Sequence, residues 1–548
     1  MWFGDLVTMK WWNGLWLNEA FATFMEMRCT DAFRPEWQRW VDFSLSRTAA
    51  FKTDALSTTR PIEFDVVSPS EAEGMFDILT YEKGAAVVRM LEQHLGEVEF
   101  RSGIRRYMNE NAYGNAETTD LWDAIEAETG EPVRRIMDSW IFQGGFPLVS
   151  VAVDGTKLSI SQTRYSMLGA SESAAQTWAV PIRFRYQLPN EAPQTVRILL
   201  EDEAAEIQLD DHPEWLVANA EGASFIRISY PPKHLEHLAT VALDVLNPEE
   251  RYALIDDAWA AVLSGDMTAN QFLSLTESAT AETDRSVWQR IIGGFASLER
   301  LLSGDALDDY RSIVHDAMSP ALANLGLAPS DDLELPESDR MRQLRGDLIR
   351  AMGTIASDRE IQDEAKRTVA EGRRNPELVD PAVLTAAVDV TASIGDEADF
   401  NDYVFTMKNA SSPQEEARYL NALADFPDDE QHAELRRMVL DGEIRSQNAP
   451  MVIRRALANR SQSHATWDFI VANWARLNDA FPTSMIVRMV DSIDTMSHPG
   501  DAEKVSEFFA QHPIEQGAKT LQQILEYQRV ATALRDRESE RLARTLGD

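Results

Sequence analysis

Cysteine is almost missing from this chain of 548 residues: Cys29 stands alone, so no disulfide can form within the chain. The apolar residues Phe24, Met25 and Met27 precede it and predict a buried thiol with a structural role. Because a chain without disulfides fits a reducing compartment, we expect the protein to be cytoplasmic.

Positive charge is also scarce. Lysine and arginine together number 52 against 90 acidic residues, which gives a formal net charge of −38. An acidic surface repels nucleic acids and anionic membranes, so a nucleic-acid-binding function is disfavoured. It suits cationic partners such as peptides with a free amino terminus, although a general solubilising effect is the simpler interpretation.

Long apolar runs are missing too. No segment reaches the ~20 residues that a membrane-spanning helix needs. Residues 1–20 also lack the basic stretch followed by an apolar run that marks a signal peptide. The sequence therefore predicts no membrane segment in this chain.

What the chain does have is helical periodicity, interrupted once. Residues 1–146 predict helices, for example from Tyr81 to Leu95. Residues 147–230 alternate with a period of two, include a turn at Asp154-Gly155, and predict a small β-sandwich. Residues 231–548 predict an irregular helical array of the HEAT or armadillo kind. The expected fold is mainly α with a small β-sandwich, in three domains divided at these positions.

The segment W-L-N-E-A-F-A at residues 16–22 carries the most information about chemistry. Gluzincin zinc peptidases place H-E-x-x-H on one helix, where two histidines bind the metal and the glutamate acts as general base. A glutamate on the next helix is the third ligand. The segment resembles this second helix in the aminopeptidase N family, with Ala20 where the family usually has glycine. The resemblance implies that Glu19 is a zinc ligand.

The residues before that segment extend the resemblance, because residues 2–12 match the family's stretch between the two ligand helices. The tryptophans at 2, 11, 12 and 16 are interpreted as core residues that do not bind substrate. If the sheet and the metal-binding helix of the family are missing, we expect the surface around these tryptophans to be partly exposed.

A second segment, F-D-I-L-T-Y-E-K-G-A at residues 76–85, resembles the family's F-D-x-I-x-Y-x-K-G-A. In the family this tyrosine hydroxyl hydrogen-bonds the oxygen of the tetrahedral intermediate, where negative charge develops. The resemblance implies that Tyr81 is catalytic. A lone tyrosine at the start of a helix is otherwise more often a packing residue.

The resemblance covers essentially the whole chain. Residues 140–147, 215–227 and 251–259 are similar to family segments that end the catalytic domain, end the β-sandwich and open the helical domain of endoplasmic-reticulum aminopeptidases. The implied architecture is the helical part of a thermolysin-like zinc peptidase domain, then a β-sandwich, then a superhelical domain.

The departures from the family concern its metal site. No H-E-x-x-H occurs in the chain, and the family's spacing places the second histidine just before Met1, so the sequence looks like a member cut after that histidine. The Gly-x-Met-Glu-Asn segment that binds the substrate's amino group is also absent. His234 and His237 lie three residues apart without a carboxylate partner and are interpreted as surface residues.

Two functions stay open. The first is a zinc metalloaminopeptidase that releases amino-terminal residues from peptides, with one zinc ion in the complete enzyme and one of its three protein ligands in this chain. This chain alone would then be inactive. The second is a non-catalytic, helical-repeat protein derived from an aminopeptidase, which binds peptides or acts as a scaffold. The reading frame upstream of Met1 would separate the two.

Overall fold

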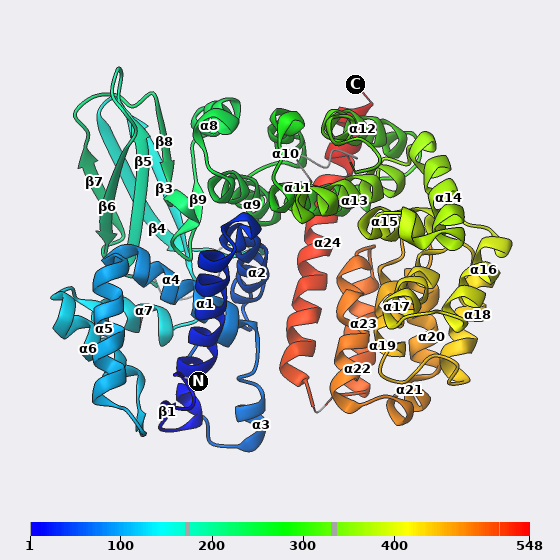
Figure 1. Ribbon diagram of the computed structural model, residues 1–548, viewed down its shortest axis with the longest axis horizontal. Coiled ribbons are helices and arrows are strands. Elements are labelled where there is room, and N and C mark those ends of the chain that lie inside the picture. The colour runs from blue at the N-terminus through cyan, green and yellow to red at the C-terminus, as the bar shows by residue number, and fades with distance from the viewer. Residues whose placement is uncertain (1, 170–175, 330–336, 515, 548) are drawn as a thin grey trace. The chain divides into compact units, whose positions relative to one another are not determined.

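The computed structural model describes residues 2–169, 176–329, 337–514 and 516–547. It divides into two compact units, Met1–Met267 and Thr268–Asp548, which are considered separately (Figure 1). The first unit spans both boundaries that the sequence suggests at 146 and 230, so a division into three domains stays a prediction. Most of the described chain is helical, as expected.

The helices of the first unit surround an aromatic core. Trp16 and Trp122 are fully buried and stacked, with their ring centroids 5.5 Å apart. A short parallel pairing of β1 (Val7–Met9) with β2 (Gly114–Ala116) fixes the chain just before the first long helix. The helices before the sheets are α1 (Trp16–Phe33), α2 (Arg39–Asp54), α3 (Pro69–Glu73), α4 (Gly84–Leu95), α5 (Glu97–Glu110), α6 (Thr118–Thr129) and α7 (Val133–Ile141).

Two small sheets follow, drawn as cyan and green arrows in Figure 1. The four-stranded sheet has the order β7-β4-β3-β9 and the three-stranded sheet the order β6-β5-β8. The predicted hairpin is confirmed: Asp154 pairs with Lys157, and Gly155 takes the positive φ of +59° that the tight turn requires. The strands are β3 (Pro147–Asp154), β4 (Lys157–Arg164), β5 (Val180–Gln187), β6 (Gln194–Leu200), β7 (Ala204–Gln208), β8 (Trp215–Ala218) and β9 (Arg227–Ser229).

The sheets share their core with the helices that precede them. The ring of Phe51 on α2 lies 4.7 Å from that of Phe146 and 4.1 Å from that of Phe225, centroid to centroid. The buried Trp140 indole also donates a hydrogen bond of 2.9 Å to the Ala179 carbonyl oxygen. Two further helices, α8 (Pro232–Val245) and α9 (Pro248–Ser264), complete this unit.

The second unit consists of helices, many of which begin at an aspartate or serine that caps the first turn. Asp284, Asp380 and Asp396 each accept two backbone N–H groups, so part of the chain's acidity stabilises helix starts. The helices are α10 (Ala269–Thr276), α11 (Arg285–Glu299), α12 (Asp305–Leu325), α13 (Asp339–Thr354), α14 (Arg359–Arg374), α15 (Pro381–Ser393), α16 (Glu397–Lys408), α17 (Pro413–Ala422), α18 (Asp429–Leu440), α19 (Ala449–Ala458), α20 (Ser463–Ala472), α21 (Trp474–Ala480), α22 (Thr483–Met489), α23 (Asp501–Gln511) and α24 (Ala518–Leu546).

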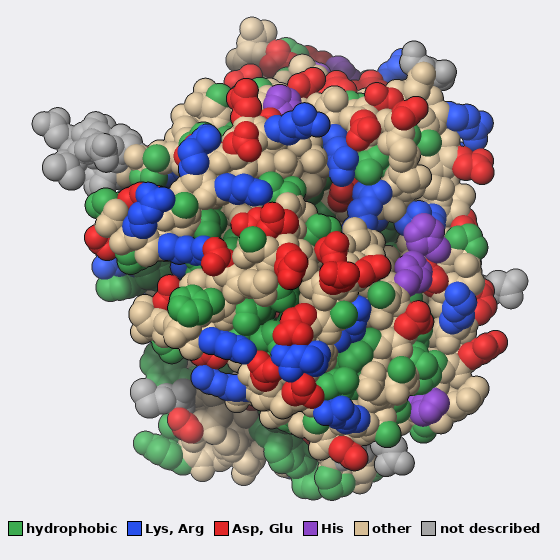
Figure 2. All heavy atoms as spheres, turned by 90° about the vertical axis from the view of Figure 1, so that its right-hand side faces the viewer, with side chains coloured by type: hydrophobic (Ala, Val, Ile, Leu, Met, Phe, Trp, Pro, Cys, Tyr) green, Lys and Arg blue, Asp and Glu red, His purple; other side chains and the backbone are tan. Residues whose placement is uncertain are grey.

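The last helix of this unit returns to its first. α24, drawn in red in Figure 1, contains the fully buried Glu538, whose Oε2 accepts the Ala269 amide at the start of α10 at 3.0 Å. On the visible face of the second unit, acidic and basic side chains are intermixed, as Figure 2 shows.

Two expectations about exposure need correction. Cys29 is exposed, because its position on α1 turns it away from the face that buries Phe24 and Met27. Of the four tryptophans, only Trp16 is core, while those at 2, 11 and 12 are 62%, 59% and 40% exposed. Among the described helices, none combines the length and the apolar character needed to cross a membrane.

Candidate active site around Glu19 and Tyr81

Glu19 lies in the first turn of α1, and a partly buried polar cluster holds that turn in place. The Trp16 indole N–H is 3.0 Å from both Glu63 Oε2 and the Thr118 hydroxyl oxygen, and the Asn13 amide donates to Glu63 Oε1 at 2.9 Å. Burial raises the pKa of Glu63, although these hydrogen bonds oppose the shift. No sequence motif singled out Glu63, whose role depends on residues distant in the chain.

Tyr81 lies on η3 (Leu79–Lys83), a π-helical turn directly before α4. The sequence predicts an ordinary helix from Tyr81 onward, and this expectation is wrong for the first turn. Asp77 starts the turn, because its Oδ1 accepts the amides of Leu79 and Thr80 at 3.0 and 3.1 Å. Single π-turns occur often at functional sites, since they redirect one side chain without ending the helix.

The structure brings Glu19 and Tyr81 together: the Glu19 carboxylate lies close enough to the Tyr81 hydroxyl to perturb its pKa. Partial burial is the larger of two causes that raise the pKa of Tyr81 to about 12, and the nearby negative charge of Glu19 is the other. The hydroxyl therefore stays protonated at neutral pH and remains a hydrogen-bond donor.

A close approach of two small residues makes this contact possible. A Cβ added to Gly84 would lie 2.6 Å from the Cβ of Ala20, so glycine at 84 is what lets the start of α4 approach α1. Ala20 follows Glu19 directly, and Gly84 lies one turn after Tyr81. The spacing of the two helices thus sets the distance between the two predicted site residues.

The described residues do not form a zinc site by themselves. Among them, no group of three or more His, Cys, Asp or Glu side chains is placed to hold a metal ion. Glu19 supplies one carboxylate of the type that zinc binds, whereas zinc sites in enzymes use three protein ligands. The His234 and His237 rings contact the carbonyl oxygens of Leu216 and Glu214, both at 2.8 Å. His237 is exposed, as expected of a surface residue, whereas His234 is half-buried.

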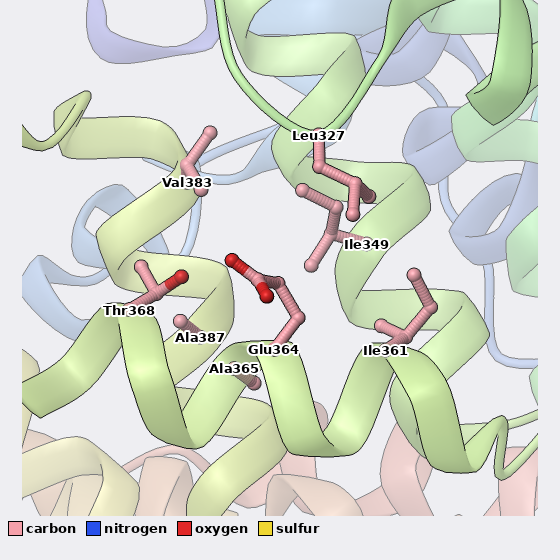
Figure 3. A pocket seen from close by; sticks show the side chains of 8 residues that line it. All are labelled: Leu327, Ile349, Ile361, Glu364, Ala365, Thr368, Val383 and Ala387. Atoms are coloured by element: carbon pink, nitrogen blue, oxygen red, sulfur yellow. The ribbon is translucent and has the colours of Figure 1, made fainter.

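Among the described residues, two of the hollows lie away from Glu19 and Tyr81. One, in the second unit, has room for about one water molecule, ≈ 10 Å³, and is lined mainly by apolar side chains of α13, α14 and α15, with Glu364 and Thr368 beside them (Figure 3). The other, of ≈ 400 Å³, covers small side chains such as Ser150, Ser159 and Ser229 on the four-stranded sheet. Neither is lined by Glu19 or Tyr81.

Comparison with known proteins gives two matches, one that includes the segments around Glu19 and Tyr81 and one that includes most helices of the second unit. Residues 1–140 match the peptidase family M1 domain, and residues 215–530 match the ERAP1-like C-terminal domain.

Among curated relatives, aminopeptidase M1-A of Oryza sativa subsp. japonica is 30% identical over 96% of this chain and 61% of its own length. Tricorn protease-interacting factor F2 of Thermoplasma volcanium is 34% identical over 71% of this chain and 47% of its own. Mitochondrial aminopeptidase 2 of Saccharomyces cerevisiae is 28% identical over 93% and 54%. The chain thus spans about three fifths of the rice relative's length, and it belongs to the M1 aminopeptidase family, with an M1 peptidase segment followed by an ERAP1-like C-terminal domain.

Proposed function

We propose that this chain is part of a zinc metalloaminopeptidase and supplies Glu19 and Tyr81 to its active site. The observation that carries the proposal is the proximity of these two side chains, which lie beside the close contact between Ala20 and Gly84. They come from separate elements, and each lies in a segment that resembles a motif of the family. Membership in the M1 family and relatives named aminopeptidases support the same reaction class.

In this proposal the Tyr81 hydroxyl binds the carbonyl oxygen of the scissile peptide bond. Negative charge develops on that oxygen as the bond is attacked, and a fixed hydroxyl donor is worth most at that moment. The high pKa of Tyr81 keeps its proton in place throughout the neutral range. To act on substrate, the hydroxyl turns from Glu19 to the carbonyl oxygen.

Glu19 is the metal-binding residue of the proposal. Since the described residues lack a full ligand set, the remaining ligands and the general base belong to an H-E-x-x-H segment that this sequence does not contain. The chain alone is therefore expected to be inactive on peptides. Its substrates would be peptides with a free amino terminus, and its second unit a superhelical array.

The experiment compares the 548-residue chain with a longer protein that includes an upstream H-E-x-x-H segment. Only the longer protein should hydrolyse aminoacyl-naphthylamides, and a chelator should abolish that activity. In it, Tyr81→Phe should lower kcat about a hundredfold, on the order of 3 kcal/mol, with a small effect on KM. Unchanged kcat would show that Tyr81 is a packing residue. Hydrolysis by the 548-residue chain would refute the proposed division of the site.

A further inference from the structure

The π-turn that carries Tyr81 is fixed at both ends by side chains from other segments. At its start, Asp77 accepts the amides of Leu79 and Thr80, and the Arg60 guanidinium donates from Nε to Asp77 Oδ2 at 3.2 Å. Arg60 is itself buried and also donates to the Thr80 hydroxyl at 2.9 Å. The beginning of the turn is therefore tied to the loop after α2.

At its end, the turn is held by Lys83, whose side chain is completely buried. The Lys83 ammonium lies 2.7 Å from Asp54 Oδ2 and donates to the Gly145 carbonyl oxygen at 3.2 Å. Asp54 Oδ1 accepts the Gly145 amide at 2.9 Å and the Thr59 hydroxyl at 2.6 Å. One buried charge pair thus joins three segments: the π-turn, the last residue of α2 and the link that leads into β3.

Stability alone is a weak reason for such a pair. Removing two charges from water costs several kcal/mol each, and well-packed apolar side chains often replace buried ion pairs without loss. The pair instead fixes the orientation of the Lys83 side chain, because the ammonium must contact both Asp54 and the Gly145 carbonyl oxygen. A π-turn holds one residue more than an α-turn, so its register needs such fixed points.

We propose that Lys83 is a positioning residue for Tyr81: held by Asp54 and the Gly145 carbonyl, it keeps the π-turn in the register that directs the Tyr81 hydroxyl to Glu19. Lys83 itself has no contact with Glu19 in this account and acts only through the backbone of η3. The catalytic consequence rests on the proposed function, whereas the contact between Tyr81 and Glu19 can be measured without catalysis.

The test uses the full 548-residue chain labelled with 3-fluorotyrosine. The ¹⁹F resonance of Tyr81 is the one that disappears in Tyr81→Phe, and its shift in Glu19→Ala, which removes the carboxylate altogether, defines the signature of a lost contact with Glu19. Lys83→Met, which keeps the length of the side chain, should move the resonance toward that signature. Lys83→Arg should restore it at least in part, because a cation is again held by Asp54.

Because Lys83→Met leaves Asp54 as an uncompensated buried charge, a second variant guards against simple unfolding. Asp54→Asn combined with Lys83→Met removes both charges, and the amide oxygen can still accept the Gly145 N–H. Circular dichroism establishes that this variant is folded. Its Tyr81 resonance should also move toward the Glu19→Ala signature.

The matched control breaks a buried ion pair elsewhere in the same unit. Arg185→Met removes the partner of the fully buried Glu250, to which Arg185 Nε donates at 3.0 Å. It should destabilise the protein and leave the Tyr81 resonance in place. If the resonance moves equally in Arg185→Met, or stays unchanged in the folded double variant, Lys83 has no positioning role. Either result leaves the proposed catalytic role of Tyr81 to the separate kinetic test.

Discussion

At the scale of single residues, the buried side chain of His432 should make the stability of the protein depend on pH. Its side chain is fully buried and its Nε2 atom contacts the Phe426 carbonyl oxygen at 2.8 Å. Desolvation lowers the pKa of His432 to about 4. The folded protein therefore holds a neutral ring that the unfolded chain would protonate near pH 6.5.

We expect His432 to lower stability in acid. Because its pKa is depressed in the folded state, its full contribution is present above pH 6.5 and is lost as the pH falls toward 4. The loss should approach about 3 kcal/mol. Urea unfolding of the protein and of His432→Gln at pH 7 and pH 5 measures it, since the variant should lose less stability between the two. The exposed His237→Gln serves as control and should follow the unsubstituted protein.

The second residue-scale prediction concerns the contact between Ala20 and Gly84. Gly84→Ala would place two Cβ atoms 2.6 Å apart, so the helices must shift, at a cost of about 1–3 kcal/mol. Adding Ala20→Gly to that variant makes room for the new methyl group. The double-mutant cycle, followed by thermal unfolding, should show a favourable coupling between the two positions. Strict additivity would mean that the two helices do not meet at this contact.

At the scale of elements, the sequence predicts the hairpin correctly, but it does not predict the π-turn. The hairpin at Asp154-Gly155 follows from local chemistry, because a two-residue turn needs a residue that tolerates positive φ. The π-turn at η3 depends on Arg60 and Asp54, which lie far from it in the sequence. The spacing of apolar residues predicts which face of a helix is buried, but it does not reveal the one extra residue of a π-turn.

The contact between the last and first helices of the second unit gives a prediction at this scale. Glu538→Ala should destabilise the unit by about 1–3 kcal/mol, because the buried Ala269 amide would lose its acceptor. The matched control is Glu540→Ala, two residues along α24, where the side chain is 91% exposed. Chemical unfolding should separate the two variants. Equal stability would show that the cap at α10 contributes nothing measurable.

At the scale of the whole molecule, we expect the second unit to fold on its own. A fragment of residues 268–548 keeps both the start of α10 and all of α24, so it should unfold in one cooperative transition. A fragment of residues 147–548 separates Phe225 from Phe51 and Phe146, whose rings pack together. It should show exposed apolar surface by dye binding, which the shorter fragment should not.

Metal binding is also a property of the whole chain. Since the described residues hold no group of three suitable ligands, zinc should bind weakly to the 548-residue chain, and Glu19→Gln should change that little. Equilibrium dialysis with elemental analysis measures both proteins. One tightly held zinc per chain at neutral pH would require a ligand set outside the described residues and would overturn the proposed site.

The sequence by itself determined the family, the succession of helices, strands and helices, and the two residues on which the proposed site depends. These follow from local patterns, because a motif, a hydrophobic period of two or 3.6 residues and a turn dipeptide can be recognised without knowledge of distant contacts. Only the tertiary structure decided that Cys29 is exposed, that Trp16 alone of the first four tryptophans is core, and that Lys83 lies between Asp54 and the Gly145 carbonyl. Burial and register depend on which surfaces meet, and that is fixed by packing across the whole unit.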